Sequence, residues 1–315
     1  MCYSAQVSES LKKLRRKFSA QVDFDQIEWT FRKRVQRQKD FLISRAFEFN
    51  FDNPESSEEQ RIKALIDDYR KARATELEAE LFAQKQRLVK AERDIAHATQ
   101  AGSKPTKKAE NDLRIAMAKI EKHKQWLDDL HRTDPLPRDA RIFVDHFAPI
   151  VVRENHVNVI RLARYHLRRR GKPESFDRQY EGLYNARRDN LEKFWAPEFG
   201  KTHAVFLVES FFENVERDGE KRVAHFTPAD GREMIIACLY SQWGEPHGDG
   251  FLSFAAITDE PPEEVRTAGH DRIIINLDES VTHEWLRPAG KSVADLQAIL
   301  DTRSRPFYEH QLLAA

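Results

Sequence analysis

The sequence predicts an α+β fold, with a mixed, largely antiparallel β core and an inserted long antiparallel helical hairpin. Two observations predict the hairpin. A stretch free of Gly and Pro and rich in Ala, Glu, Lys, Leu and Arg runs from about Ser56 to Gln100, and a break at 101–105 separates it from a second helical pattern. A third observation predicts the β core, because short β-branched and aromatic runs between turn residues follow Pro137.

The helical stretch carries a narrow apolar stripe that mixes steps of three, four and seven residues. Its members are Ile62, Leu65, Ile66, Tyr69, Leu77, Leu81, Leu88 and Ile95, and the second pattern runs from Leu113 to Leu130. Two helices joined by a short turn fold back on each other. We therefore expect a coiled-coil hairpin at about 56–131, which offers a surface for a protein partner or for self-association.

The β core is expected from a series of short apolar runs. These are 142–144, 150–152, 203–208, 211–216, 222–226, 234–240, 251–257 and 273–276. An arginine-rich helix is expected over Val157 to Arg170, a late helix over Val293 to Leu300, and basic helical structure over Ser8 to Ile43. The predicted domains are 1–7 with 136–290 as a β-rich domain that holds the candidate site, 8–135 as a helical insertion, and 291–315 as a C-terminal helix and tail.

Composition excludes several classes of protein. The 52 basic and 52 acidic residues cancel, so any attraction to a polyanion must come from local patches. Two cysteines without a CxxC pair argue against a disulfide framework or structural zinc, and they are typical of a reducing compartment. Nowhere do about 18 apolar residues run together, and the first residues lack a secretory apolar segment. We expect a cytoplasmic, nucleoid-associated protein that has no membrane partner.

Cys2 directly follows the initiator Met, and its small side chain lets methionine aminopeptidase expose a free α-amino group. The exposed residue is a 1,2-aminothiol. Its amine is partly unprotonated at neutral pH and can attack an aldehyde to form a Schiff base. The thiol can then close on the imine carbon and give a durable thiazolidine. This chemistry depends on the removal of Met1, and chain termini are often poorly ordered.

Three internal blocks carry further candidate residues. Asn185-Ala186-Arg187 offers an amide that can hold an amine and a hydroxyl together, although turns and helix caps also use Asn. Glu213 follows an apolar strand and two aromatic residues, a setting that raises a carboxyl pKa and suits a general acid and base, or else it faces solvent at a strand edge. His270-Asp271-Arg272 places a proton shuttle and a cation before a buried-looking strand, where His is also often structural.

In this order, Met1-Cys2, Asn185-Ala186-Arg187, Phe211-Phe212-Glu213 and His270-Asp271-Arg272 resemble the four signature blocks of the SOS response-associated peptidase (SRAP) family. The resemblance covers the terminus and roughly residues 140 to 288. It implies a β-rich fold with a DNA-binding groove, whose terminal Cys bonds covalently to the ring-opened aldehyde of an abasic site in single-stranded DNA. It implies no cofactor and no metal, and it makes residues 8–135 an elaboration.

The resemblance also implies a role for each block. Cys2 is the nucleophile, Asn185 positions its amine and the opened sugar, and Glu213 is the acid/base for ring opening and for autocatalytic release of Met1. His270 assists the Schiff-base step, its reversal, or β-elimination in a lyase reaction. The arginines expected to bind DNA are Arg187, Arg188, Arg272, Arg164 and Arg168.

The chain departs from the family pattern beside each block. Tyr3-Ser4 stands where many members have Gly-Arg after the Cys, Arg188-Asp189-Asn190 where Ser-Glu-Thr is usual, and Ser210 and Asn214 flank the Glu block in place of Gly and Trp. These departures affect the expected geometry of the bound DNA and the preference for flanking sequence more than the expected chemistry.

Two other functions remain open. A DNA-binding or coiled-coil interaction module would use the hairpin and would not need Cys2. An amide hydrolase with a terminal Cys nucleophile would turn over a small amide and form no stable bond to DNA. Phosphate-loop, dinucleotide-binding and zinc-protease motifs are absent from the sequence.

Overall fold

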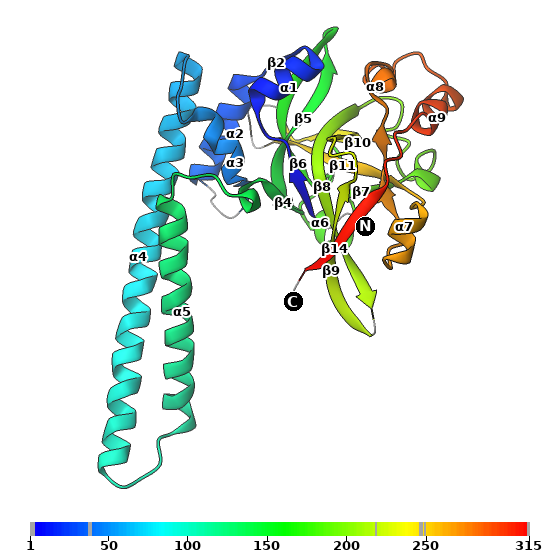
Figure 1. Cartoon of the computed structure of the whole chain (residues 1–315). Helices are drawn as coiled ribbons and strands as arrows, with labels where there is room; N and C mark the ends of the chain where they lie inside the picture. The colour runs from blue at the N-terminus through cyan, green and yellow to red at the C-terminus, as the bar shows by residue number, and fades with distance from the viewer. Residues whose placement is uncertain (1–3, 37–39, 218, 246–247, 249, 314–315) are drawn as a thin grey trace. The chain divides into compact units, whose positions relative to one another are not determined.

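The computed structural model describes residues 4–36, 40–217, 219–245, 248 and 250–313. The chain folds as two compact units, one formed by Met1–Lys63 with Leu136–Ala315 and the other by Ala64–Pro135 (Figure 1). The first unit contains all the strands of the described chain, and the second contains most of the long hairpin. Each unit is described separately below.

The strands of the first unit form one sheet that closes on itself. Along one path, strands β10, β11, β6, β5 and β8 pair in succession, and β8 also pairs with β10, so these five strands form a barrel (Figure 1). The path strands are β1 (Ser4–Val7), β4 (Arg141–Phe143), β5 (His146–Glu154), β6 (Val157–Tyr165), β8 (His203–Arg217), β10 (Met234–Trp243), β11 (Phe251–Asp259) and β13 (Asn276–Leu277). The pairings along this path are antiparallel except between β11 and β6.

Six further strands extend the sheet. They are β2 (Ala20–Val22), β3 (Leu42–Ile43), β7 (Asn185–Arg187), β9 (Glu220–Pro228), β12 (Ile273–Ile274) and β14 (Tyr308–Leu313). The long strand β8 continues beyond the barrel and pairs there with β1 and β9, and β14 pairs with β9. The predicted fold class, a mixed and largely antiparallel β core with an inserted helical hairpin, is confirmed.

Alternation of side chains along the strands builds the core, because successive residues of a strand point to opposite faces. Ala204, Phe206 and Val208 of β8 enter one buried cluster together with Phe254 of β11. Cys238 of β10 lies in the same cluster and is fully buried, where it packs as a small apolar residue.

The predicted helix over Val157 to Arg170 is wrong: Val157–Tyr165 is strand β6, paired with β5 from Val157 to Arg164. Asn155 and His156, between the two strands, both have positive φ, as the two-residue turn of a tight hairpin requires. The β-branched residues of β6 and this turn outweigh the helix propensity of its two arginines and Leu162.

The basic stretch from Ser8 to Ile43 is only partly helical. Helices α1 (Leu11–Phe18) and α2 (Phe24–Gln36) alternate there with β2 and β3, which pair in parallel with β6 and β5. The remaining helical elements of this unit are short. They are α3 (Arg45–Glu48), η1 (Phe49–Phe51), η2 (Pro137–Ala140), α6 (Ser175–Gln179), η3 (Arg188–Asn190), α7 (Glu263–Thr267), α8 (Glu279–Trp285) and α9 (Val293–Asp301).

The hairpin consists of α4 (Ser57–Gln100) and α5 (Lys107–His131). Gly102 takes the positive φ that the turn requires, and the Thr106 hydroxyl caps α5. Contacts between Arg87 and Asp112 (2.5 Å) and between Glu80 and His123 (2.8 Å) show that the helices run antiparallel.

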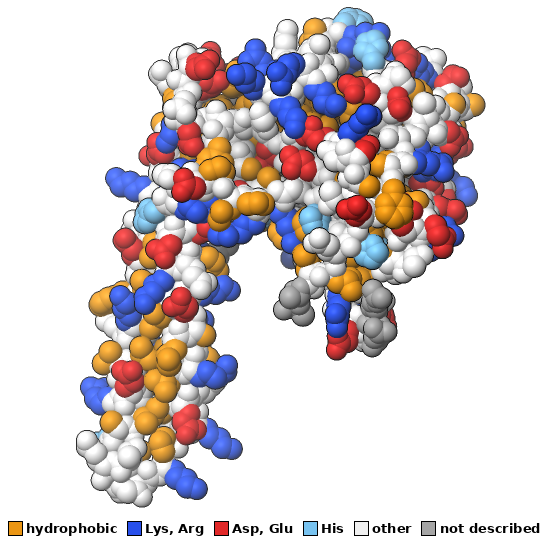
Figure 2. Space-filling model, viewed as in Figure 1, with side chains coloured by type: hydrophobic (Ala, Val, Ile, Leu, Met, Phe, Trp, Pro, Cys, Tyr) orange, Lys and Arg blue, Asp and Glu red, His pale blue; other side chains and the backbone are white. Residues whose placement is uncertain are grey.

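Apolar side chains are also exposed along this unit (Figure 2). They include Phe82, Val89, Met117 and Trp126. No helix within the described ranges has the length and apolarity needed to cross a membrane.

A buried carboxyl group joins the segment after β1 to the start of α3. The Glu9 carboxyl group contacts the Ser44 hydroxyl, and the Asn50 side chain donates to the backbone carbonyl of Glu9 and accepts from the amide of Leu11, both at 2.9 Å. Burial raises the pKa of Glu9 from 4.5 to about 8. The folded protein therefore holds a proton on Glu9 at neutral pH, where the unfolded chain has lost it.

This raised pKa predicts that Glu9 lowers stability as pH rises. Between pH 4.5 and about 8 the folded state binds more protons than the unfolded state, so the free energy of unfolding should fall by about 1.4 kcal/mol per pH unit from this group. Glu9→Gln should remove that contribution and raise stability at alkaline pH, as measured by urea unfolding across the range. Glu181→Gln, an exposed control, should keep the wild-type slope. An unchanged slope in Glu9→Gln would contradict the assignment.

Candidate active site

Glu213 and His270 are in direct contact. Glu213 lies on β8 after Phe211 and Phe212, and its side chain is only 1% exposed. The His270 Nε2 atom lies 3.3 Å from its Oε2 atom, and His270 Nδ1 lies 2.8 Å from the Arg272 carbonyl oxygen. Burial lowers the pKa of His270, which favours the neutral ring. A buried carboxyl next to a neutral imidazole can move a proton in either direction.

Asn185 enters the site from β7. This strand pairs in parallel with the end of β11, with Asn185 opposite Ala256 and Arg187 opposite Thr258. Thr258 is also paired with Ile274 of β12, the strand that follows His270. The elements that carry Asn185 and His270 therefore flank the same end of β11.

Two buried polar side chains at this end of β11 lack hydrogen-bond partners. Within the ranges that the structure describes, neither the amide nitrogen nor the amide oxygen of Asn185 has one, and the hydroxyl of Thr258 has none. An unsatisfied buried polar group costs about 1–3 kcal/mol, so three such atoms at one place suit a ligand with both donors and acceptors. Sequence reasoning missed Thr258, whose only signal is that it ends the apolar run of its strand.

Cys2 lies outside the described residues, which begin at Ser4. The described N-terminal strand begins beside the strand that carries Glu213. Ser4 pairs with Phe212, the residue immediately before Glu213, in the antiparallel ladder between β1 and β8. Ala5 and Val7 are buried in the core cluster and hold this strand in register.

Two of the predicted DNA-binding arginines share one carboxylate. Arg187 Nη2 lies 2.7 Å and Arg272 Nη2 lies 3.6 Å from Asp189 Oδ2. The Arg187 side chain is 52% exposed and that of Arg272 is 15% exposed. Hydrogen bonds from Arg187 lower the pKa of Asp189, so its carboxylate stays charged. Arg187 is the more accessible cation of the pair.

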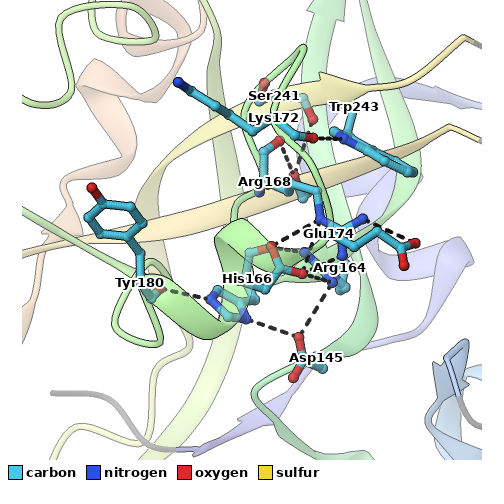
Figure 3. A network of polar contacts seen from close by, with 11 residues as sticks. Asp145, Arg164, His166, Arg168, Lys172, Glu174, Tyr180, Ser241 and Trp243 are labelled. Atoms are coloured by element: carbon cyan, nitrogen blue, oxygen red, sulfur yellow. Dashed lines mark hydrogen bonds and ion pairs between the residues drawn. The ribbon is translucent and has the colours of Figure 1, made fainter.

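Arg164 and Arg168 take part in a separate network (Figure 3). Arg164 lies in β6, and His166 and Arg168 follow in the irregular segment after the strand. Both arginines bind the Asp177 carboxylate, at 2.8 Å from Arg164 Nη1 and 2.9 Å from Arg168 Nε, and His166 Nδ1 lies 3.0 Å from Asp145. The side chains of Arg164 and Arg168 are 8% and 6% exposed, respectively.

The arginines of this network also stack on aromatic rings and connect distant strands. Arg168 lies over Trp243, 4.4 Å from the ring centroid, and Arg164 lies over Phe251 at 4.7 Å. The Trp243 indole donates to the Lys172 carbonyl (Figure 3). These contacts give the network a bracing role between β6 and the β10–β11 hairpin.

The fifth predicted arginine, Arg188, also has carboxylate partners. It binds Asp259 at 3.1 Å and Asp301 at 2.7 Å. The predicted DNA contacts of Arg188, Arg164 and Arg168 stay predictions. To bind DNA, each of these guanidinium groups would have to release its Asp carboxylate and bind a phosphate group instead. Among the residues that the structure describes, no group of three or more His, Cys, Asp or Glu side chains is arranged to hold a metal ion.

A sequence model of the family described as SOS response associated peptidase (SRAP) matches residues 106–312, about two thirds of the chain. The chain belongs to the SRAP family. The matched range contains the Asn185, Glu213 and His270 blocks, as the resemblance implied. It begins within the hairpin, so Cys2 and most of the helical elaboration lie outside it.

Individual relatives are distant. Two proteins named abasic site processing protein YoqW, from Bacillus subtilis (strain 168) and Bacillus phage SPbeta, are each 26% identical over 123 residues. The match covers 38% of this chain and 54% of each relative, so the chain spans about half the length of the curated relatives it matches.

Solved structures of two bacterial proteins are also similar to this SRAP chain. One, from Bordetella bronchiseptica, is 18% identical with a TM-score of 0.47 and covers 56% of this chain and 88% of its own. The other, from Bacteroides thetaiotaomicron, is 17% identical with a TM-score of 0.47 and covers 55% and 77%.

Proposed function

We propose that this SRAP protein processes abasic sites in DNA by forming a covalent bond through its N-terminal Cys2. The observation that carries the proposal is the buried Glu213–His270 pair, located beside the strand that leads back to Cys2. The family match and the names of the two distant relatives support the same substrate. Two peptide units separate Cys2 from Ser4, so their Cα atoms lie at most about 7.6 Å apart.

Ring opening is the first step of the proposed reaction. Glu213 protonates the ring oxygen of the abasic sugar, neutral His270 accepts the proton of the C1 hydroxyl, and the bond between C1 and the ring oxygen breaks to give the aldehyde. His270 then passes its proton to Glu213, 3.3 Å away. The amine of Cys2 then adds to the aldehyde carbon, and loss of one water gives the Schiff base. The Cys2 thiol adds to the imine carbon and its proton passes to the nitrogen, which closes a five-membered thiazolidine. Neutral His270 takes up and returns protons during dehydration.

The other residues orient the reactants. The unsatisfied amide of Asn185 would hold the terminal amine through its oxygen and a sugar hydroxyl through its nitrogen. The Thr258 hydroxyl would supply a further contact at the same end of β11. Arg187 and Arg272 would bind flanking phosphates of the single strand, which places Asp189 in competition with DNA.

The proposal is tested by incubating the protein with single-stranded DNA that contains one abasic site, followed by a denaturing gel and intact-mass analysis of the terminus. We expect a shifted band that is absent from Cys2→Ala and from DNA without the lesion. If a protein that has lost Met1 binds this DNA but gives no shifted band, the crosslinking function is wrong. Turnover of a small amide by the same protein would favour the hydrolase alternative.

Asp189→Asn should strengthen the binding of undamaged single-stranded DNA. The substitution removes the carboxylate that occupies Arg187 and Arg272, so both cations become available to phosphates. We expect affinity to rise about three- to tenfold, and the slope of log affinity against log salt to steepen by about 0.7 per added phosphate contact. Fluorescence anisotropy across a salt series measures both. Asp230→Asn, in a turn of another part of the unit, is the matched control and should bind DNA as wild type does. Unchanged affinity in Asp189→Asn would refute competition between its carboxylate and DNA phosphates.

We also propose that the hairpin binds a protein partner or a second copy of the chain. The exposed side chains of Phe82, Val89, Met117 and Trp126 support this role, since large apolar side chains are costly to leave in water. Sedimentation of the protein and of a Phe82→Ser, Val89→Ser variant tests self-association, which the double substitution should weaken.

A further inference from the structure

Arg141 is bound to the N-terminal strand at the residue where that strand begins. It is the first residue of β4, which pairs with β1 so that Ser4 lies opposite Phe143 and Gln6 opposite Arg141. The Arg141 Nε and Nη2 atoms donate to the Ser4 hydroxyl oxygen at 3.0 and 2.9 Å. Ser4 is fully buried, so this oxygen is shielded from competing water.

The Arg141 guanidinium is itself held by two neighbouring strands. Its central carbon lies 3.7 Å from the centroid of the Phe212 ring, and Phe212 stacks on His225 with ring centroids 4.2 Å apart and nearly parallel planes. The His225 Nε2 atom lies 2.7 Å from the Ser210 hydroxyl. A planar guanidinium on an aromatic face has little freedom to rotate, so β8 and β9 fix the position from which Arg141 reaches Ser4.

The two faces of β1 are therefore held by different means. Ala5 and Val7 point into the core cluster, and alternation places Ser4 and Gln6 on the opposite face. Gln6 donates to the Pro137 carbonyl on that face, beside the Arg141–Ser4 contact. A strand of four residues near a chain end would otherwise fray. Arg141 and Gln6 clamp its outer face while the core holds its inner face.

We propose that Arg141 is a positioning residue that fixes Ser4 opposite Phe212, the residue before Glu213, and that the proposed reaction of Cys2 depends on this contact. This inference rests on the proposed function. Arg141 contacts no reacting atom and acts through Ser4. The reaction needs the terminal amine and the aldehyde in near-attack geometry, and a displacement of about 1 Å can cost about 100-fold in rate.

The test compares Arg141→Gln, Ser4→Ala and the double variant, with Arg138→Gln as a control that removes a nearby exposed positive charge. Single-turnover crosslinking is measured at saturating abasic single-stranded DNA, and the Kd for undamaged single strand is measured separately. We expect each single variant to slow crosslinking about 10- to 100-fold. The double variant should be no slower than the slower single variant, because both substitutions remove the same contact. The Kd for undamaged DNA should change less than about twofold in each variant. Arg138→Gln should match wild type.

Two results would overturn the proposal. Additive losses in the double variant would show that Arg141 does not act through Ser4. A raised Kd in Arg141→Gln with normal crosslinking in Ser4→Ala would make Arg141 a DNA contact. If Arg141→Gln fails to fold, as judged by thermal unfolding, Ser4→Ala alone carries the test, because it removes the same hydrogen bonds and no bulk.

Hydrogen exchange separates failure of this inference from failure of the proposed function. Amides of Ser4–Val7 should exchange faster in both single variants than in wild type, whether or not any DNA reaction occurs. Unchanged exchange would refute the clamp even in a protein that crosslinks, whereas faster exchange in a protein that forms no crosslink would leave the clamp standing and refute only the function.

Discussion

Cys2→Ser should leave a protein that reacts with abasic single-stranded DNA but forms no durable crosslink. Serine keeps the terminal amine, so the Schiff base still forms. The hydroxyl is a much weaker nucleophile than the thiol and does not close a stable ring on the imine carbon. Borohydride, which reduces the imine to an amine, should trap an adduct in both proteins. Without borohydride, only the wild-type adduct should survive heating.

Cys238→Ala is the matched control for this change. Cys238 is the other cysteine of the chain and is fully buried in the barrel core, so it has no access to DNA. Its replacement by alanine should leave the durable crosslink intact. A heat-stable adduct from Cys2→Ser without borohydride would contradict ring closure by the thiol, and loss of all trapped product would mean that the substitution prevents the amine from reacting.

Glu213→Gln should slow crosslinking by a factor of about 10² to 10⁴. Glutamine has nearly the same shape as glutamate but cannot donate the proton that ring opening needs. The substitution also removes the acidic partner that lies 3.3 Å from His270. Single-turnover kinetics on abasic single-stranded DNA measure the loss. Intact-mass analysis of the same protein shows whether release of Met1 also depends on Glu213.

Glu209→Gln is the control for Glu213→Gln, because Glu209 is an exposed carboxylate on the same strand. It should crosslink at the wild-type rate. The wild-type rate should also fall on acidification. Acid first protonates the nucleophilic amine of Cys2, and the rate should fall further once pH drops below the lowered pKa of His270, because the protonated ring no longer accepts a proton. A Glu213→Gln rate within about threefold of wild type would remove this residue from the mechanism.

Local sequence pattern identified most strands but failed where two patterns competed. The runs that became β8, β10 and β11 are rich in β-branched and aromatic residues, which outweigh the few helix-favouring residues among them. In β6 the two arginines, Leu162 and Ala163 favour a helix, and the deciding factor is the hairpin with β5 through the turn at Asn155 and His156. Helix propensity is a weak prior that tertiary pairing overrides.

The candidate site was only partly accessible to sequence reasoning. Glu213 and His270 stand in blocks with a chemical signature, and the structure brings them into contact. Thr258, Asp189 and Arg141 carry no such signature. Their relevance comes from pairing between segments far apart in the chain, such as Arg141 with Ser4 across 137 residues. Register of that kind is a property of the assembled sheet.

The most direct test of the account is to digest the crosslinked product with nuclease and protease and to map the modified peptide by mass spectrometry after treatment with iodoacetamide. We predict an adduct on a peptide that begins at Cys2 without Met1, whose sulfur is not alkylated and whose mass does not change with borohydride, because the thiol and the imine carbon are both in the ring. An adduct on another residue, or a Cys2 peptide that is unmodified and fully alkylated, would contradict the account.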